Sequence, residues 1–265
     1  MKKNILITGS TDGIGKIAAM MFAKEGHTVL IHGRNKVKLS ETLSEIKLKT
    51  NNENVQGFVA DFSDLDSVKQ MAEQIKQEIS KIDILINNAG VYNSPDSDNK
   101  DGLDIRLTVN YLAPYLLTND LLPLLEKGFE SRIINLASAA QSPVSIDVLL
   151  GKVKKNQGET YAQSKLALSM WSFWLARSLQ NISVIAVNPG SLLNTKMANE
   201  AFGTHWAPAE KGANIIYDLA ISEEHKSITG KYFDNDSGAF ANAHPDAYNE
   251  ATINKLIEVT ESIIN

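Results

Sequence analysis

The sequence predicts an α/β protein with a doubly wound parallel sheet, in a single domain over residues 1–265. Short apolar runs rich in β-branched residues alternate with amphipathic segments along most of the chain. The runs are continuously apolar rather than alternating, which is typical of strands buried on both faces. No repeat, linker or change in composition marks a second domain. Repeated strand–helix units of this kind favour a parallel sheet with right-handed crossovers.

The expected elements follow one another in regular order. Apolar residues at i, i+3 and i+4 predict helices between the strands. Two loop-rich intervals, near 142–158 and 191–208, are too polar or irregular for strands, and we expect them to form insertions over the substrate site. The expected strands are residues 4–8, 28–32, 55–60, 82–86, 132–136 and 182–187, and the expected helices are 14–24, 37–48, 65–79, 103–125 and 161–179.

Composition excludes several classes of protein. With 43% hydrophobic and 22% charged residues, the chain is neither disordered nor fibrous. A net charge of -5 argues against nucleic acid or an anionic membrane surface as the partner. The absence of cysteine removes thiolate chemistry, and the five histidines lack metal-ligand spacing, so no metal is expected. No apolar run is long enough for a secretory signal or a membrane span, and we expect a cytoplasmic protein.

A glycine-rich motif follows the first predicted strand and leads directly into an amphipathic helix. In this context backbone amides and the positive end of the helix dipole bind a pyrophosphate. Glycine permits the tight turn and the close approach of the backbone to the ligand. The run Thr8–Gly15 therefore predicts a dinucleotide site, with contacts from Gly9, Ser10, Thr11, Gly13, Ile14 and Gly15.

The end of the second predicted strand indicates which dinucleotide binds. The sequence reads Ile31-His32-Gly33-Arg34-Asn35, with no carboxylate to hold both ribose hydroxyls of NAD. The guanidinium of Arg34, next to Asn35, can pair with a 2'-phosphate, so we expect NADP(H) to be preferred over NAD(H). The alternative is a solvated arginine in a turn.

Tyr161 and Lys165 are the candidate reacting groups. Their i, i+4 spacing places both side chains on one helix face. The spacing alone is weak evidence, since it also arises by chance. Ser138 supports it, because a hydroxyl at the carboxyl end of a buried strand lies where open α/β sheets bind ligands. The alternatives are a tyrosine at the core edge, a lysine paired with a carboxylate and a serine in an ordinary turn.

Taken together, these motifs resemble those of the short-chain dehydrogenase/reductase family over nearly the full length of the chain. The segment Leu121–Leu125, the long spacer between Ser138 and Tyr161, and the run Tyr161–Ala167 look most like the retinol-dehydrogenase-like branch. The resemblance implies a Rossmann-type fold. It rests on the glycine motif, Asp61-Phe62, Asn87-Asn88-Ala89-Gly90, Asn110, Ser138, the Tyr161/Lys165 pair and Asn188-Pro189-Gly190.

The resemblance implies a catalytic role for four residues. Tyr161 would exchange a proton with the substrate oxygen, and Ser138 would hydrogen-bond that oxygen. The ordinary pKa of tyrosine, near 10, is too high for this at neutral pH, and the ammonium of Lys165 is expected to lower it. Lys165 would also donate to the nicotinamide ribose. Asn110 would hold a water that links Lys165 to solvent, although an asparagine in a helix is more often locally bonded.

Further cofactor contacts are implied by the same resemblance. Asp61 would accept from the adenine amino group, or it could instead cap the following helix. Thr195 would reach the carboxamide, but one residue more than the usual family spacing separates it from Gly190. The residues with an implied contact are Asp61, Phe62, Asn87, Asn88, Ala89, Gly90, Tyr161, Lys165, Pro189, Gly190 and Thr195.

The substrate and the state of association are less strongly indicated. Met197, Phe202 and Trp206 could line a pocket for a lipophilic carbonyl or alcohol, or could simply pack. The predicted helix 161–179 is more apolar than one buried face requires, which suggests a homodimer, although the long spacer could obstruct that face. The function expected is an NADP(H)-dependent oxidoreductase acting on CH–OH and C=O groups. The alternatives are an NADPH-binding regulator with vestigial catalytic residues, and an epimerase or dehydratase.

Overall fold

The computed structural model describes residues 1–264 and contains a doubly wound parallel sheet in a single domain, as predicted. The eight strands lie in the order β3-β2-β1-β4-β5-β6-β7-β8. All neighbouring pairs are parallel except β7 and β8, which pair antiparallel. The strands are β1 (Asn4–Ile7), β2 (Thr28–Gly33), β3 (Val55–Val59), β4 (Ile84–Asn87), β5 (Ser131–Leu136), β6 (Ile182–Asn188), β7 (Lys231–Asp234) and β8 (Ala239–Ala241).

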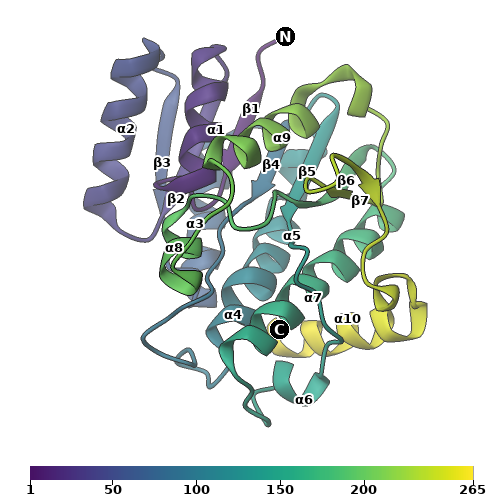
Figure 1. Cartoon of the computed structure of the whole chain (residues 1–265). Helices are drawn as coiled ribbons and strands as arrows, with labels where there is room; N and C mark the ends of the chain where they lie inside the picture. Colours follow the sequence, from purple (N-terminus) through teal and green to yellow (C-terminus); the bar gives the residue numbers. More distant parts are fainter. Residues whose placement is uncertain (265) are drawn as a thin grey trace.

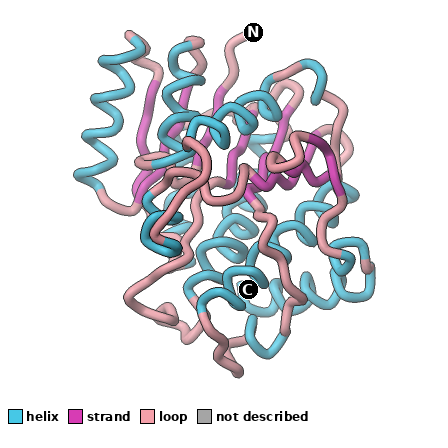
Figure 2. Tube along the Cα trace, viewed as in Figure 1, coloured by secondary structure: helices cyan, strands magenta, loops and turns pink. Residues whose placement is uncertain are grey.

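Helices cover both faces of this sheet (Figures 1 and 2). One face packs against α1 (Gly13–Lys24), α2 (Lys36–Thr50) and α9 (Ala209–Ile221). The other packs against α3 (Leu65–Glu78), α5 (Ala113–Leu125), α7 (Gln157–Ser178) and α10 (Glu250–Ile264). The shorter helices are α4 (Ile105–Leu107), the π-helix η1 (Thr108–Leu112), α6 (Ile146–Leu149), α8 (Lys196–Phe202), and the 3-10 helices η2 (Glu223–His225) and η3 (Pro245–Tyr248).

The strand order reverses between β1 and β4, which creates the point where such sheets bind ligands. The register pairs Ile7 with both Ile31 and Ile86. The segments that follow these three residues therefore lie side by side at the carboxyl edge. All three isoleucines are fully buried, which explains why their strands are continuously apolar.

Predicted and observed elements differ most clearly at 103–125. The expected single helix begins instead at Ile105, after Asp104, whose Oδ1 accepts from the Arg106 amide at 2.8 Å. It then passes through the π-helix η1 before continuing as α5. Pro123 lies inside α5 without ending it. The π-helix carries Asn110, and such bulges are frequent at functional sites.

The apolar excess on α7 is buried within the chain itself. Trp171 is fully buried, and Phe173 stacks on Tyr248 with ring centroids 5.2 Å apart. The C-terminal helix α10 lies on the same side of the sheet as α5 and α7 (Figure 1), and the hydroxyls of Tyr111 and Thr260 bond at 2.7 Å. These side chains therefore give no reason to expect a second copy on this face. In residues 1–264, no helix is both long and apolar enough to span a membrane.

Candidate active site

The glycine-rich loop after β1 is held by close backbone packing. Gly9 has φ +63°, and a Cβ there would lie 2.7 Å from Cα of Ala89. At Gly15 a Cβ would overlap Nδ2 of Asn88 and lie 2.7 Å from the Gly9 oxygen. Gly13, with φ +50°, begins α1. Only glycine fits these positions without displacing the loop, which lets the backbone approach a phosphate closely at the start of α1, where the Asp12 carboxylate accepts from the Gly13 amide at 2.8 Å.

Asn88 joins this loop to the end of β4. Its Nδ2 donates to the Thr8 oxygen at 2.8 Å and to the Gly9 oxygen at 2.9 Å. In return, Oγ1 of Thr8 accepts from the amides of Asn88 and Ala89, each at 3.0 Å. Asn88 and Ala89 thus form one wall of the loop. The side chain of Asn87, for which a cofactor contact was implied, instead points into the core and donates to Oδ1 of Asn135 at 2.7 Å.

His32 supports the loop from β2, and sequence reasoning missed this role. Its Nδ1 accepts from the Gly9 amide at 3.0 Å, and its Nε2 lies 3.0 Å from the Ala60 oxygen. This pairing requires the neutral ring with hydrogen on Nε2. Burial lowers the pKa of His32 to about 4, so the ring is neutral at physiological pH. Phe62 stacks on it at 4.2 Å, and this buried ring therefore supports the loop through His32.

Ser10 and Thr11, two loop residues predicted to contact the cofactor, differ in their surroundings. Ser10 is fully buried; its Oγ donates to the Ile7 oxygen at 2.7 Å and accepts from the His32 amide at 3.0 Å. The turn itself therefore uses the Ser10 hydroxyl. Thr11 is half-buried, and its methyl would be 2.5 Å from a Cβ at Gly33. Gly33 is required for this close packing between the loop and β2.

The exposed end of β2 carries the cationic side chain expected there. Arg34 is exposed directly after the strand, while Asn35 caps α2 by accepting from the Lys38 amide at 3.0 Å. Lys38 forms an ion pair with Asp12 of the glycine loop. Within residues 1–264, no ion pair engages Arg34, so its guanidinium is free to meet an anionic group.

Asp61, which follows β3, is exposed and accepts from the amide and hydroxyl of Ser63. Asp64, not Asp61, caps α3.

Tyr161, Lys165 and Ser138 come together at the carboxyl end of β5. Tyr161 and Lys165 lie one turn apart near the start of α7, which begins after the cap Asn156. Nζ of Lys165 lies 5.6 Å from the ring centroid of Tyr161 and donates to the Leu136 oxygen at 2.7 Å. The hydroxyl of Ser138 lies close enough to the phenol of Tyr161 to lower its pKa. The sequence spacing therefore produces a phenol, a hydroxyl and an amine in one cluster.

The electrostatics of this cluster differ from the expectation. Burial raises the pKa of Tyr161 above 10, although the hydrogen bond from Ser138 opposes this shift. Burial also lowers the pKa of Lys165 to about 8. The expected lowering of the tyrosine pKa by Lys165 is thus not found here, because the amine is directed at the Leu136 carbonyl and is itself partly deprotonated near pH 8.

Asn110 lies beside Lys165 and ties three segments together. Its Nδ2 donates to the Val91 oxygen at 3.0 Å and to Oγ of Ser164 at 2.9 Å, and its Oδ1 accepts from the Val91 amide at 2.7 Å. A Cβ at Gly90 would be 3.4 Å from this Oδ1 and 3.5 Å from Nζ of Lys165. Protein groups therefore use both amide hydrogens of Asn110, and only one lone pair of Oδ1 remains for a water.

The segment after β6 covers the glycine loop. Gly190 has φ +123° in the turn after Pro189, and Asn235 Nδ2 donates to the Pro189 oxygen at 2.8 Å. Thr195 caps α8, with its Oγ1 accepting from the Ala198 amide at 3.2 Å. Its methyl is 3.5 Å from the position of a Cβ at Gly13. The extra residue before Thr195 thus leaves it against the phosphate-binding end of the cleft.

Aromatic side chains gather over Tyr161. Tyr92 lies 4.9 Å from its ring, and Phe202 of α8 lies 5.2 Å from Tyr92. Met197 reaches to 3.8 Å from a Cβ at Gly90, while Trp206 is 74% exposed. Sequence reasoning missed Tyr92; the available signal was its place two residues after the Asn87–Gly90 motif.

The residues present fit a dinucleotide. A close-packed glycine cradle at the start of α1, a glycine beside Lys165 and Asn110, and a free guanidinium after β2 lie along one edge of the sheet. The cradle matches the pyrophosphate-binding end of such sites, and the Lys165 cluster lies at the other end. Polar groups that can exchange a proton therefore lie on the same edge of the sheet as the glycine cradle.

Comparisons with known proteins agree with this geometry. The short chain dehydrogenase family model matches residues 3–206. Retinol dehydrogenase 13 of Homo sapiens is 33% identical over 251 residues, covering 88% of this chain and 76% of that protein. Polyprenol dehydrogenase of Homo sapiens is 31% identical, covering 87% and 76%.

Solved structures give the same result. A short chain dehydrogenase of Shigella flexneri complexed with NADP has a TM-score of 0.71 and 29% identity, over 88% of this chain and 97% of that one. L-Sorbose reductase of Gluconobacter frateurii, complexed with NADPH and L-sorbose, has a TM-score of 0.71 and 25% identity, over 91% and 98%. The chain belongs to the short-chain dehydrogenase family, in its retinol-dehydrogenase-like branch, and is an oxidoreductase that uses a nicotinamide cofactor.

Proposed function

We propose that this oxidoreductase uses NADP(H) to interconvert a lipophilic carbonyl compound and its alcohol. The observation that carries the proposal is the cluster of Ser138, Tyr161 and buried Lys165 at the carboxyl end of β5, on the same edge of the sheet as the glycine loop. When bound, the nicotinamide supplies the hydride for reduction or accepts it in oxidation.

The chain's own groups handle the oxygen of the substrate. In reduction, the substrate oxygen lies between the hydroxyls of Ser138 and Tyr161 and accepts a hydrogen bond from each. The phenol of Tyr161 then gives it a proton. The phenolate left on Tyr161 lies close to Lys165, whose ammonium is the stronger acid of the two and can return a proton to it. Asn110 holds Val91 and Ser164 in place around this cluster and thereby keeps Lys165 aligned.

NADP(H) rather than NAD(H) is supported by charge. Arg34 is exposed and unpaired at the end of β2, and no carboxylate lies in that turn to receive two ribose hydroxyls. We expect Arg34→Asp to shift the NADPH:NADH ratio of kcat/KM towards NADH by at least about tenfold, the effect of losing one charged contact. An unchanged ratio in steady-state kinetics would remove this part of the proposal.

The apolar character of the substrate is supported by its surroundings. Tyr92 and Phe202 form an aromatic wall next to Tyr161, and Met197 lies beyond it. Two relatives are named for apolar alcohols, retinol and polyprenol, which supports an apolar substrate here. A polar sugar substrate would leave these rings without a partner.

The test is NADPH oxidation with a panel of lipophilic aldehydes and ketones, with Tyr161→Phe as the variant. Wild-type protein is expected to turn over at least one of them, and Tyr161→Phe to lose about 100-fold or more in kcat while still binding NADPH. Undiminished turnover by Tyr161→Phe would refute the mechanism. Tight NADPH binding without any turnover favours a regulator, and product formation without net NADPH consumption favours an epimerase or dehydratase.

A further inference from the structure

The catalytic serine has a second set of contacts, on its backbone. Tyr232 of β7 is buried, and its hydroxyl donates to the Ser138 carbonyl oxygen at 3.1 Å. The strand register places Ala186 and Ala241 on either side of Tyr232. These two small side chains leave room for the phenol ring to lie along this face of the sheet and reach the end of β5.

Gln141 reaches the same carbonyl oxygen from the other direction. Its Nε2 donates to the Ser138 oxygen at 2.8 Å, while its Oε1 accepts from the His244 amide at 3.0 Å. A carbonyl oxygen has two lone pairs, and two side-chain donors fill both of them. The turn that carries Ser138 is thus attached to β7 directly and to the segment before η3 through Gln141.

The orientation of the peptide group that contains the Ser138 carbonyl determines where the Ser138 hydroxyl can lie. Oγ of Ser138 accepts from the Ala140 amide at 3.1 Å, within the same turn, and lies beside the phenol of Tyr161. A rotation of the Ser138 carbonyl would turn the backbone that carries Oγ, and would break the bond from Ala140 and move Oγ relative to Tyr161. An error of about 1 Å in such a group is enough to slow catalysis strongly.

We propose that Tyr232, together with Gln141, is a positioning residue that fixes the Ser138 turn so that its hydroxyl meets the substrate oxygen. The kinetic part of this inference rests on the proposed function. Tyr232 lies outside residues 3–206, so the part of the chain that matches the family model does not contain it. The C-terminal strands therefore contribute to the catalytic site from outside that region.

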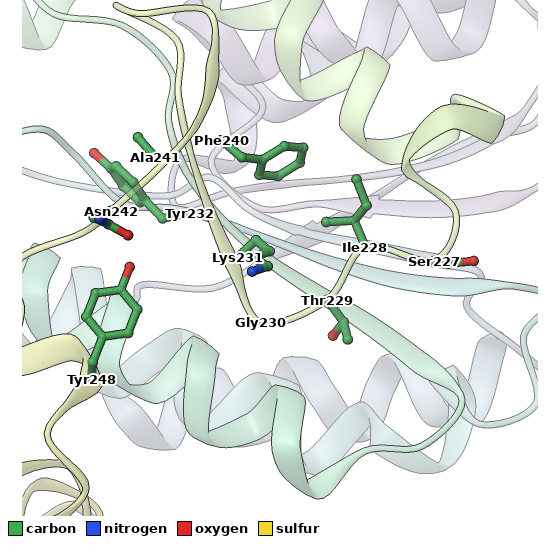
Figure 3. Close-up of a pocket in the computed structure, with 10 residues that line it drawn as sticks. All are labelled: Ser227, Ile228, Thr229, Gly230, Lys231, Tyr232, Phe240, Ala241, Asn242 and Tyr248. Carbon is green, nitrogen blue, oxygen red and sulfur yellow. The ribbon is translucent and has the colours of Figure 1, made fainter.

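Tyr248 provides a matched control. Figure 3 shows Tyr232, Asn242 and Tyr248 at one end of a surface groove lined by the segments 227–232 and 240–242, with Ser227 and Ile228 at the other end. The hydroxyl of Tyr248 accepts from the Ala243 amide at 2.9 Å and has no contact with Ser138. Tyr248→Phe therefore removes a hydroxyl from the same groove without removing a hydrogen bond to the Ser138 oxygen.

The kinetic test is a double-mutant cycle. Tyr232→Phe is expected to lower kcat about two- to tenfold, the effect of one neutral hydrogen bond, with the NADPH Kd unchanged. In the Ser138→Ala background, the same substitution is expected to have no further effect on kcat. Tyr248→Phe is expected to match wild type. An equal loss from Tyr232→Phe with and without Ser138 would show a merely structural role and overturn the proposal.

A second readout does not depend on turnover. Ser138-Ala139 is the only Ser-Ala step in the sequence, so labelling serine carbonyls with ¹³C and alanine amides with ¹⁵N gives one carbonyl-correlated NMR signal, that of Ser138. Tyr232→Phe is expected to move this signal upfield by removing a hydrogen bond, and Tyr248→Phe to leave it in place. An unmoved signal in Tyr232→Phe overturns the proposal, even if the wild-type protein turns over no substrate in the panel.

Discussion

Replacing Gly15 with alanine tests whether close packing in the glycine loop affects stability more strongly than helix propensity does. Gly15 lies in the first turn of α1, where alanine normally stabilises a helix by about 1 kcal/mol over glycine. The structure predicts the opposite sign. A Cβ at this position would overlap Nδ2 of Asn88 and approach the Gly9 oxygen to 2.7 Å. The asparagine amide must therefore move away from the loop.

The size of the effect follows from the bonds that Asn88 makes. Its amide would lose its hydrogen bonds to the Thr8 and Gly9 oxygens, each worth about 1 kcal/mol. Steric strain against Gly9 adds to this loss, and the gain in helix propensity reduces it. We expect Gly15→Ala to lower the free energy of unfolding by about 1–3 kcal/mol, or Tm by about 3–10 °C. The displaced loop should also weaken NADPH binding at least about tenfold.

Calorimetry and an NADPH fluorescence titration measure these two effects. Gly102→Ala is the matched control, because Gly102 has φ +77° but nothing lies within 4 Å of its Cβ position. It should lose about 1–2 kcal/mol through backbone strain alone and bind NADPH normally. If Gly15→Ala is as stable as wild type and binds NADPH equally well, the close packing of Gly15 against Asn88 is refuted.

Two further predictions concern buried titratable groups. Lys165 has a pKa of about 8 in the folded protein, below its ordinary 10.5. Between these two pH values only the unfolded chain keeps the proton on this amine. The free energy of unfolding therefore rises with pH across that window, by about 3 kcal/mol at most. Chemical denaturation of Lys165→Met should lack this rise, and an identical pH profile would contradict the burial of the amine. His32 stays neutral down to pH about 4, so its stabilising effect is complete above pH 6.5 and is lost as pH falls towards 4. His32→Phe should lose about 1–3 kcal/mol at pH 7 by leaving the Gly9 amide without its acceptor, and should be less sensitive to acid; a wild-type acid profile would argue against the neutral ring.

Local sequence patterns were sufficient to predict the first six strands. Continuous runs such as Ile5–Ile7 and Ile84–Ile86 are buried on both faces, so their composition directly reflects their place in the sheet. The two C-terminal strands were missed because they are too short to show a sequence pattern. β7 has four residues and β8 has three, too few to show a period, and β8 pairs antiparallel at the edge. Their pairing depends on tertiary context.

Some contacts in the candidate site could be predicted from local spacing in the sequence, and others could not. Tyr161 and Lys165 lie on one helix, so their i, i+4 spacing predicts their proximity. Tyr232 approaches Ser138 across 94 residues, and His32 approaches Gly9 across 23, so no local pattern predicts either contact. The pKa of Tyr161 also escaped prediction, because burial around the phenol raises it more than the Ser138 hydroxyl lowers it.

The most direct test of the proposed chemistry follows the hydride itself. Reduction of the best aldehyde or ketone from the panel would use NADPH that carries deuterium in place of both hydrogens at nicotinamide C4. Mass spectrometry and proton NMR of the alcohol then locate the label. We predict one deuterium on the carbinol carbon for wild-type protein, and no detectable product from Tyr161→Phe at equal NADPH occupancy. An alcohol whose carbinol hydrogen comes from solvent would contradict direct hydride transfer.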